Sequence, residues 1–344
     1  MSLLRTEIAE QPDVLARVIE RNRGPVAALA EALERRRPSF VLIASRGSSG
    51  NAARYGQHVF GRLNRLPVGF ASPSLHTVYE APPRLSGALV IGISQSGQSP
   101  DVVSVIEDAT RQDQVTVAVT NDSESPLAHA ARYVLPLHAG AEEAVAATKT
   151  YSASVCVVAQ LAAALARDRS LALELDSIPA SVARQIEETG GADSVVEIAA
   201  AWHSCAVVGR GPNYGTAFEA ALKVKELTAI TAEPYSPADL LHGPIAVVEP
   251  GYPVVAIAPS GAARPALEEL LESVRQRGGA PLVLSDAPEL ARTGEPFLPL
   301  VAVPEWLSPL VAVVPVQLLA AGIAERRGVD VDHPFGLSKV TRTR

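Results

Sequence analysis

Short apolar runs recur along the first half of the chain, and amphipathic segments separate them. Runs of this length without alternation are typical of strands that are buried on both faces of a parallel sheet. The runs that predict strands are Phe40 to Ala44, Leu89 to Ile93, Val115 to Val119 and Tyr133 to Leu137. The segments between them predict the helices that join parallel strands, one ending at about residue 62 and others over roughly 99–110 and 124–131.

Longer segments flank this set of strands. Residues 6–32 carry apolar side chains with the spacing of one helical face, which predicts a helix outside the first sheet, and Gly24-Pro25 predicts a break in it. Those apolar residues are Ile8, Val14, Leu15, Val18 and Ile19. Residues 140–167 begin polar and become a helix rich in alanine and valine, and residues 170–191 have the pattern of a connection to a second domain.

The second half repeats the plan of the first. Its strand candidates are Cys205 to Val208, Val254 to Ala258 and Leu282 to Leu284. The starts of these runs follow Phe40, Leu89 and Val115 by 165, 165 and 167 residues. Such a constant offset indicates an internal duplication. We therefore predict an α/β protein of two similar domains, each a parallel sheet between helices: a helical segment over 1–37, domains over 38–190 and 191–327, and a tail over 328–344.

The net charge and the composition disfavour some kinds of binding partner. The 344 residues carry a net charge of −7, which disfavours nucleic acid and anionic membranes as partners. The amino terminus lacks a signal-peptide pattern, and the apolar run Pro309 to Ala324 is interrupted by Pro315 and Gln317 and is short for a bilayer. Cys156 and Cys205 lie in apolar surroundings without a CxxC spacing, as buried thiols do. We expect a soluble cytoplasmic protein.

Hydroxyl-rich turns follow two of the predicted strands. Ser94, Gln95, Ser96 and Ser99 come after the second strand and before a helix, and Ser48 and Ser49 come after the first. Backbone N–H groups and the positive end of a helix dipole meet at such a turn, so it favours an anion. No Gly-Lys-Ser/Thr follows, so the turn fits a phosphate monoester better than a nucleoside triphosphate. The alternative is a polar turn with a helix cap.

Candidate acid–base groups cluster in the second half. Glu219, Lys223 and Glu226 have the i, i+4, i+7 spacing of one helical face, which is either a solvated face with ion pairs or a base with its orienting charge. His242, before Gly-Pro, suits acid–base work or is a surface histidine. Lys339 is either a solubilising charge or an amine for Schiff-base chemistry. The spacing Gly209-x-Gly211-x-x-x-Gly215 departs from the dinucleotide fingerprint and predicts only a tight turn.

Together these motifs resemble the sugar-isomerase (SIS) family, in particular the isomerase half of the glucosamine-6-phosphate synthases and the stand-alone glucosamine-6-phosphate deaminases. The resemblance runs from about residue 38 to the end and implies tandem SIS domains of the three-layer α/β/α type. The segments that carry it are Gly47-Ser48-Ser49, Ser94-Gln95-Ser96-Gly97, Val145 to Lys149, Glu219 to Glu226, His242-Gly243-Pro244 and Leu337-Ser338-Lys339.

The resemblance assigns a role to each group. It implies that the sugar phosphate and nearby hydroxyls are held by Ser48, Ser49, Ser94, Gln95, Ser96 and Ser99, with Val145 and Glu219 also in the substrate site. Glu226 would move a proton between C1 and C2, Lys223 would support the site, and Lys339 would form an imine with the open ketose. His242 would assist ring opening from across a homodimer interface. No metal or organic cofactor is required.

The implied activity is conversion of glucosamine 6-phosphate to fructose 6-phosphate and ammonia. The sequence departs from many relatives at Thr231, where they have histidine, so the substrate preference stays open. Because the first predicted sheet strand begins near Phe40, we expect no glutaminase domain before it. The alternatives are a deglycase of fructosamine 6-phosphate, a deaminase of another amino-sugar phosphate such as galactosamine 6-phosphate, and a sugar-phosphate-binding protein without catalysis.

Overall fold

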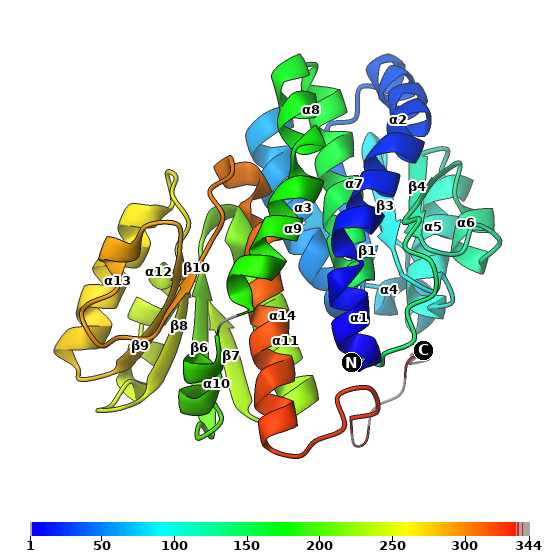
Figure 1. Cartoon of the computed structure of the whole chain (residues 1–344). Coiled ribbons are helices and arrows are strands. Elements are labelled where there is room, and N and C mark those ends of the chain that lie inside the picture. The colour runs from blue at the N-terminus through cyan, green and yellow to red at the C-terminus, as the bar shows by residue number, and fades with distance from the viewer. Residues whose placement is uncertain (1, 191, 335, 337–338, 340–344) are drawn as a thin grey trace. The chain divides into compact units, whose positions relative to one another are not determined.

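The computed structural model of the chain describes residues 2–190, 192–334, 336 and 339. These residues form two compact units, each assembled from three segments of the chain. The first-sheet unit consists of Asp13–Glu142, Lys149–Ser177 and Ser338–Arg344. The second-sheet unit consists of Met1–Pro12, Glu143–Thr148 and Ile178–Leu337. Both sheets are parallel and have helices on both faces, as the sequence predicts, but each has five strands where the sequence predicted four and three (Figure 1).

The first sheet has the strand order β2-β1-β3-β4-β5. Its strands are β1 (Phe40–Ser45), β2 (Val68–Phe70), β3 (Ala88–Ile93), β4 (Val115–Thr120) and β5 (Tyr133–Pro136). Its helices are α2 (Gln11–Arg36), α3 (Gly47–Asn64), α4 (Ser74–Thr77), α5 (Pro100–Arg111), α6 (Pro126–Ala130), α7 (Lys149–Ala166) and α8 (Arg169–Asp176). Ile106 of α5 and Leu127 of α6 pack against Gly92 on one face, and Gly56 of α3 packs against Ile43 on the other.

The second sheet has the order β10-β9-β8-β6-β7, which is the same topology when β6 to β10 are matched to β1 to β5. Its strands are β6 (Ser204–Gly209), β7 (Thr231–Tyr235), β8 (Pro253–Ile257), β9 (Ala280–Ser285) and β10 (Phe297–Pro299). Its α-helices are α1 (Leu3–Ala9), α9 (Ile178–Thr189), α10 (Asp193–Ala199), α11 (Tyr214–Thr228), α12 (Pro237–Leu241), α13 (Arg264–Gln276) and α14 (Ser308–Arg326). The duplication inferred from the 165-residue offset is therefore visible as repeated topology.

Both faces of the second sheet are covered by apolar side chains of its helices. One face packs against α11 and α14, with Val207, Val255 and Leu282 in that core. The other face packs against α12 and α13, with Ala206 and Val254 in the core. Figure 1 shows α13 and α14 on opposite sides of this sheet. Short 3-10 helices lie at Gly211–Asn213, Pro244–Val247, Pro288–Leu290 and Glu305–Leu307.

The predicted break at Gly24-Pro25 is wrong, because α2 runs through Pro25 without interruption. Gly24 and Pro25 are exposed, whereas Asn22, Val26 and Leu29 on the same helix are buried. A continuous buried face on both sides of the proline stabilises the helix despite the lost backbone hydrogen bond. Pro25 therefore lies inside the helix on its solvent side.

The predicted connection over 170–191 is largely helical, since it contains α8 and most of α9. Two of the longest helices are also apolar enough to cross a membrane by length and composition, over Lys149–Ala166 and Glu305–Arg326. Of their most apolar windows, 83% and 94% of the residues are buried inside the protein. Such burial is what the core helices of an α/β fold require, so these helices are no evidence for a membrane span.

Candidate active site

The two hydroxyl-rich turns lie beside each other at the carboxyl edge of the first sheet. β1 and β3 are neighbours, and Ser45 is paired with Ile93 at the last position of both strands. The chain leaves β1 toward β2 on one side and leaves β3 toward β4 on the other. A strand order of this kind forms a crevice at the point where the connections diverge, and open α/β sheets bind their ligands there. Ser48, Ser49 and Ser94 to Ser99 thus belong to one edge.

The turn after β3 is fixed by backbone hydrogen bonds to the following elements. Gly97 donates to the carbonyl of Ser94 at 3.1 Å and accepts from the N–H of Leu127, also at 3.1 Å. The carbonyl of Gln95 accepts from the N–H of Asn121 at 3.0 Å. Because the backbone is held by these contacts, the side chains of the turn keep a defined position at the sheet edge. A preorganised turn loses little conformational entropy when it binds an anion.

Ser99 is the N-cap residue of α5, but its side chain does not cap the helix. Its Oγ is buried and has no hydrogen-bond partner among the described residues. A buried hydroxyl at a helix amino terminus that is not used by the protein itself is available to a ligand, where the helix dipole also favours an anion.

An ion pair that the sequence analysis did not identify joins the two turns. Nη2 of Arg46 lies 2.6 Å from Oδ2 of Asp101, and Nε of Arg46 lies 3.2 Å from the same oxygen. Arg46 directly precedes α3, and Asp101 lies in the first turn of α5 with 2% of its surface exposed. The opposite charges at the ends of the two motifs were visible in the sequence, but their pairing depends on the register of β1 with β3.

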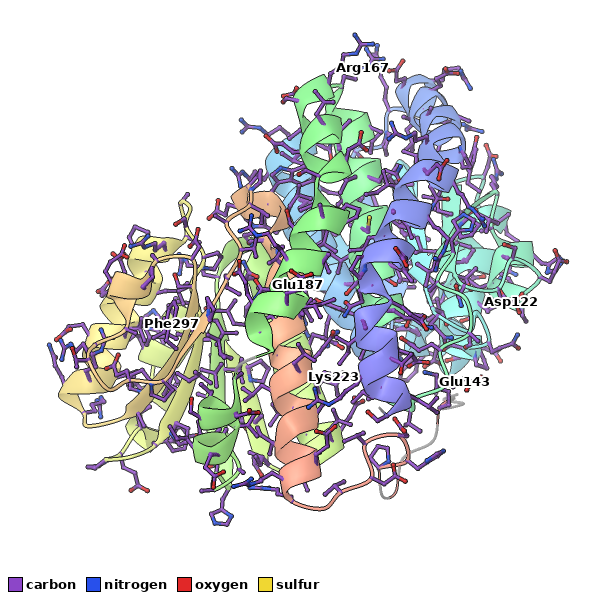
Figure 2. All side chains as sticks on the ribbon, viewed as in Figure 1. Asp122, Glu143, Arg167, Glu187, Lys223 and Phe297 are labelled. Carbon is purple, nitrogen blue, oxygen red and sulfur yellow. The ribbon has the colours of Figure 1, made fainter. Side chains whose placement is uncertain are left out.

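The three charged residues of α11 form a largely buried cluster. Nζ of Lys223 lies 2.5 Å from Oε2 of Glu226 and 3.5 Å from Oε1 of Glu219. The side chains of Lys223 and Glu219 are 1% and 0% exposed, whereas that of Glu226 is 24% exposed. Lys223 is labelled in Figure 2. Because Lys223 and Glu219 are buried, the i, i+4, i+7 spacing does not mark a solvated helix face. Glu226 is the carboxylate of the cluster that solvent can reach.

His242 follows the short helix α12 and is exposed. Its backbone N–H donates to the carbonyl of Ala238 at 3.0 Å, and Gly243 after it has a φ of 126°, which only glycine adopts readily. Leu241 and Val247 beside it are 37% and 50% exposed. His242 is thus an exposed histidine with two exposed apolar side chains close to it in the sequence.

Lys339 is bound to the first-sheet unit by a buried carboxylate. Its Nζ lies 3.2 Å from Oε2 of Glu142, and Thr150 at the start of α7 donates its backbone N–H and its hydroxyl to the same carboxylate. Val145 lies in the second-sheet unit, where its backbone N–H donates to the carbonyl of Asp332 at 3.3 Å. Glu142 was not singled out from the sequence, although it precedes the Val145-to-Lys149 motif by three residues.

The two cysteines are free and buried, as predicted. Burial raises the pKa of the Cys205 thiol to about 12 and raises the pKa of Cys156 as well, so both stay protonated and unreactive near neutral pH. Within the described residues, no three histidine, cysteine, aspartate or glutamate side chains are grouped as a metal site requires.

Comparison with known families agrees with this arrangement of two similar sheets. The model of the SIS domain matches residues 36–164 and 183–323. The chain belongs to the SIS domain family. The family resemblance inferred from the motifs is thus confirmed, together with the fold class of two SIS-like halves.

Relatives of the SIS chain extend this result. The glutamine–fructose-6-phosphate aminotransferase (isomerizing) of Zymomonas mobilis is 31% identical over 98% of this chain and 58% of its own length. The chain therefore spans little more than half of that relative. The solved C-terminal domain of the glucosamine-fructose-6-phosphate aminotransferase of Francisella tularensis is 26% identical, with a TM-score of 0.89 over 97% of this chain and 98% of that domain.

A third relative shares the fold. The glucosamine-6-phosphate deaminase of Thermotoga maritima is 22% identical, with a TM-score of 0.81 over 99% of this chain and 100% of that protein. At this identity the likeness shows the fold alone. A protein named for deamination thus has a closely similar fold, so the fold by itself leaves the reaction open.

Proposed function

We propose that this SIS protein converts glucosamine 6-phosphate to fructose 6-phosphate and ammonia. The observation that carries the proposal is the cluster on α11, in which the buried ammonium of Lys223 is held between Glu219 and the partly exposed Glu226. A carboxylate oriented by a buried cation and open to solvent on one side can take a proton from a bound substrate. The names of the relatives from Zymomonas mobilis and Thermotoga maritima support a glucosamine or fructose phosphate as that substrate.

The phosphate of the sugar binds at the two hydroxyl turns in this proposal. Ser48, Ser49, Ser94, Gln95, Ser96 and Ser99 supply uncharged donors at the diverging ends of β1 and β3. The unused hydroxyl of Ser99 supports this assignment, since a phosphate oxygen would satisfy it. Asp101 is neutralised by Arg46, so its carboxylate does not repel the phosphate.

The reaction moves one proton within the open-chain sugar. Glu226 removes the hydrogen of C2, and the electrons of that C–H bond form a double bond between C1 and C2 while the C1 oxygen takes up a proton. Return of a proton to C1 leaves an imine at C2. Water adds to this imine, and the nitrogen leaves as ammonia, which gives fructose 6-phosphate. Val145 and Glu219 complete the substrate site in this proposal, with Lys223 holding Glu226 in place.

Lys339 and His242 act on the carbonyl and on the ring. The amine of Lys339 forms an imine with C2 of the open ketose, with loss of the ketose oxygen as water. His242 assists ring opening and reaches the substrate from a second copy of the chain in a homodimer. The exposed apolar side chains of Leu241 and Val247 next to His242 support a protein contact at this position.

The experiment is a coupled assay of ammonia release from glucosamine 6-phosphate by the wild type and by Glu226→Gln. We expect turnover to fall by roughly two to four orders of magnitude, as the loss of a general base does. Glu249→Gln, which changes an exposed glutamate, is the control and should keep wild-type turnover. Wild-type turnover in Glu226→Gln would remove the base assigned here.

The substrate is decided in the same assay with a panel of phosphosugars. Galactosamine 6-phosphate and fructosamine 6-phosphate test the other deaminase and deglycase activities that Thr231 leaves open. Binding of these phosphates without turnover of any of them would instead favour a sugar-phosphate-binding protein.

A further inference from the structure

The ion pair between Lys339 and Glu142 joins a partly exposed amine to a fully buried carboxylate. The Glu142 side chain is 0% exposed, whereas that of Lys339 is 27% exposed. Thr150 donates to the same carboxylate from its backbone N–H at 3.1 Å and from its hydroxyl at 2.6 Å. The carboxylate is thus fixed by the first turn of α7, while the lysine reaches it from the C-terminal segment and keeps part of its surface in solvent.

Lysine is much rarer than arginine in this chain. Of the 30 lysine and arginine residues, only four are lysine, at 149, 223, 225 and 339, which leaves 26 arginines. Arginine forms stronger and better-oriented ion pairs with carboxylates, so a purely structural anchor to Glu142 would be expected to use it. A primary amine differs from a guanidinium in that it can become a nucleophile.

We propose that Glu142 is a positioning residue, which anchors the C-terminal segment through Lys339 and thereby holds the amine where it reacts with the sugar carbonyl. Glu142 acts through Lys339 and does not touch the sugar. The anchoring role stands on the geometry alone, and the reactive role of Lys339 rests on the proposed function. The two parts can be tested separately.

The anchoring is tested with lysyl endopeptidase on the native protein. Cleavage after Lys339 requires this side chain to enter the protease pocket, which its contact with Glu142 prevents. The other lysines are buried or lie within helices. We expect Glu142→Gln to accelerate release of the peptide after Lys339, followed by mass spectrometry, by about ten-fold or more, because a hydrogen bond between charged groups is lost and proteolysis follows the open population.

Glu143→Gln is the matched control, because it makes the same change at the next residue, which is exposed. It should leave the cleavage rate unchanged. Thr150→Val keeps the charge of Glu142 and removes one hydrogen bond, so it should accelerate cleavage by a smaller factor. Melting curves of each variant separate this effect from unfolding. Unchanged cleavage in folded Glu142→Gln and Thr150→Val, or equal acceleration in Glu143→Gln, would overturn the anchoring role.

The reactive role is tested by borohydride reduction in the presence of fructose 6-phosphate. Hydride reduces the carbon–nitrogen double bond of an imine to a stable secondary amine, which mass spectrometry places on Lys339. We expect ten-fold less adduct in Glu142→Gln than in the wild type and in Glu143→Gln. If the wild type forms no adduct, the role of Lys339 in the proposed function fails while the anchoring result stands. Equal adduct in Glu142→Gln and wild type would overturn the positioning role.

Discussion

The hydroxyl of Ser99 is a buried polar group without a hydrogen-bond partner among the described residues. The backbone carbonyl of Ser99, by contrast, accepts from the N–H groups of Val102 and Val103. An unsatisfied buried hydroxyl lowers the stability of the fold by about 1–3 kcal/mol. A hydrogen bond from this hydroxyl to a bound phosphate would explain why the fold keeps a destabilising group at the amino end of α5.

Ser99→Ala should therefore have opposite effects on stability and on binding. We expect the free energy of unfolding in urea to stay the same or to rise by up to about 1 kcal/mol, because an unpaired polar atom is removed. We expect the KM for glucosamine 6-phosphate to rise by about ten-fold, because a hydrogen bond to a charged group is lost. Ser273→Ala is the control, because this half-buried serine of α13 lies outside the turn and donates its hydroxyl to the carbonyl of Glu269. A destabilised variant with unchanged KM would show that the hydroxyl is structural.

Sequence reasoning at this scale identified residue types but not their long-range partners. Ser94 to Ser99 were selected because hydroxyls and glycine follow an apolar run. Arg46 and Asp101 are 55 positions apart, and Lys339 and Glu142 are 197 apart, so no local pattern pairs them. Such pairs become visible only when strand order and the course of the C-terminal segment are known.

The turn between β3 and α5 depends on a glycine for two separate reasons. Gly97 has a φ of +62°, and a Cβ at this position would lie 2.1 Å from Oγ of the buried Ser125. Gly140 has a similar φ of +69°, but nothing lies within 4 Å of its Cβ position. A substitution at Gly140 therefore tests the free-energy cost of the left-handed backbone alone, and a substitution at Gly97 tests that cost together with the steric clash against Ser125.

Gly97→Ala and Gly140→Ala should differ in stability and in substrate binding. Gly140→Ala should lower the free energy of unfolding by about 1–2 kcal/mol, which is the cost of a left-handed conformation. Gly97→Ala should cost about 1–3 kcal/mol more, because Ser125 must move, and should also weaken phosphosugar binding. Chemical denaturation and the KM for glucosamine 6-phosphate measure both effects. Equal stability losses in the two variants would show that the collision is relieved without cost.

The sequence predicted those strands that coincide with an apolar run. It did not predict elements whose formation depends on packing against the rest of the fold. The four apolar runs of the first half are β1, β3, β4 and β5. Three edge strands were missed: β2 and β10 have three residues each, too few for a periodicity, and β7 has the sequence Thr-Ala-Glu-Pro-Tyr, which contains no apolar run. The helix α2 was expected to break at Pro25, but packing on both sides of the proline keeps it continuous.

The assignment of α9 to the second-sheet unit shows how tertiary contacts group the segments. Gln185 of this helix is fully buried, and its amide donates to the carbonyl of Pro299 at 2.9 Å. Its Oε1 accepts from the backbone N–H of Val301 at 2.7 Å. One side chain thus satisfies two backbone groups of the segment after β10. The boundaries expected from the sequence after residues 37, 190 and 327 stay predictions.

Gln185→Leu should destabilise the protein although leucine is of similar size and more apolar. We expect the free energy of unfolding in urea to fall by about 2–5 kcal/mol, because the N–H of Val301 and the carbonyl of Pro299 both lose a buried partner. Glu187→Leu, an exposed position on the same helix, should change it by less than about 0.5 kcal/mol. A neutral Gln185→Leu would mean that water replaces the amide, so that α9 is held by apolar contacts alone.

The sequence by itself determined the α/β class, the duplication and the family, because each depends on a local order of residue types or on a constant offset along the chain. It also located the hydroxyl turns, whose binding of an anion stays a prediction. The tertiary structure decided which charged groups meet. The paired ends of β1 and β3 bring Arg46 to Asp101, burial turns the face of α11 into a closed cluster around Lys223, and the C-terminal segment brings Lys339 to Glu142. These pairings require a folded backbone, since their partners are selected by proximity and by exclusion of water.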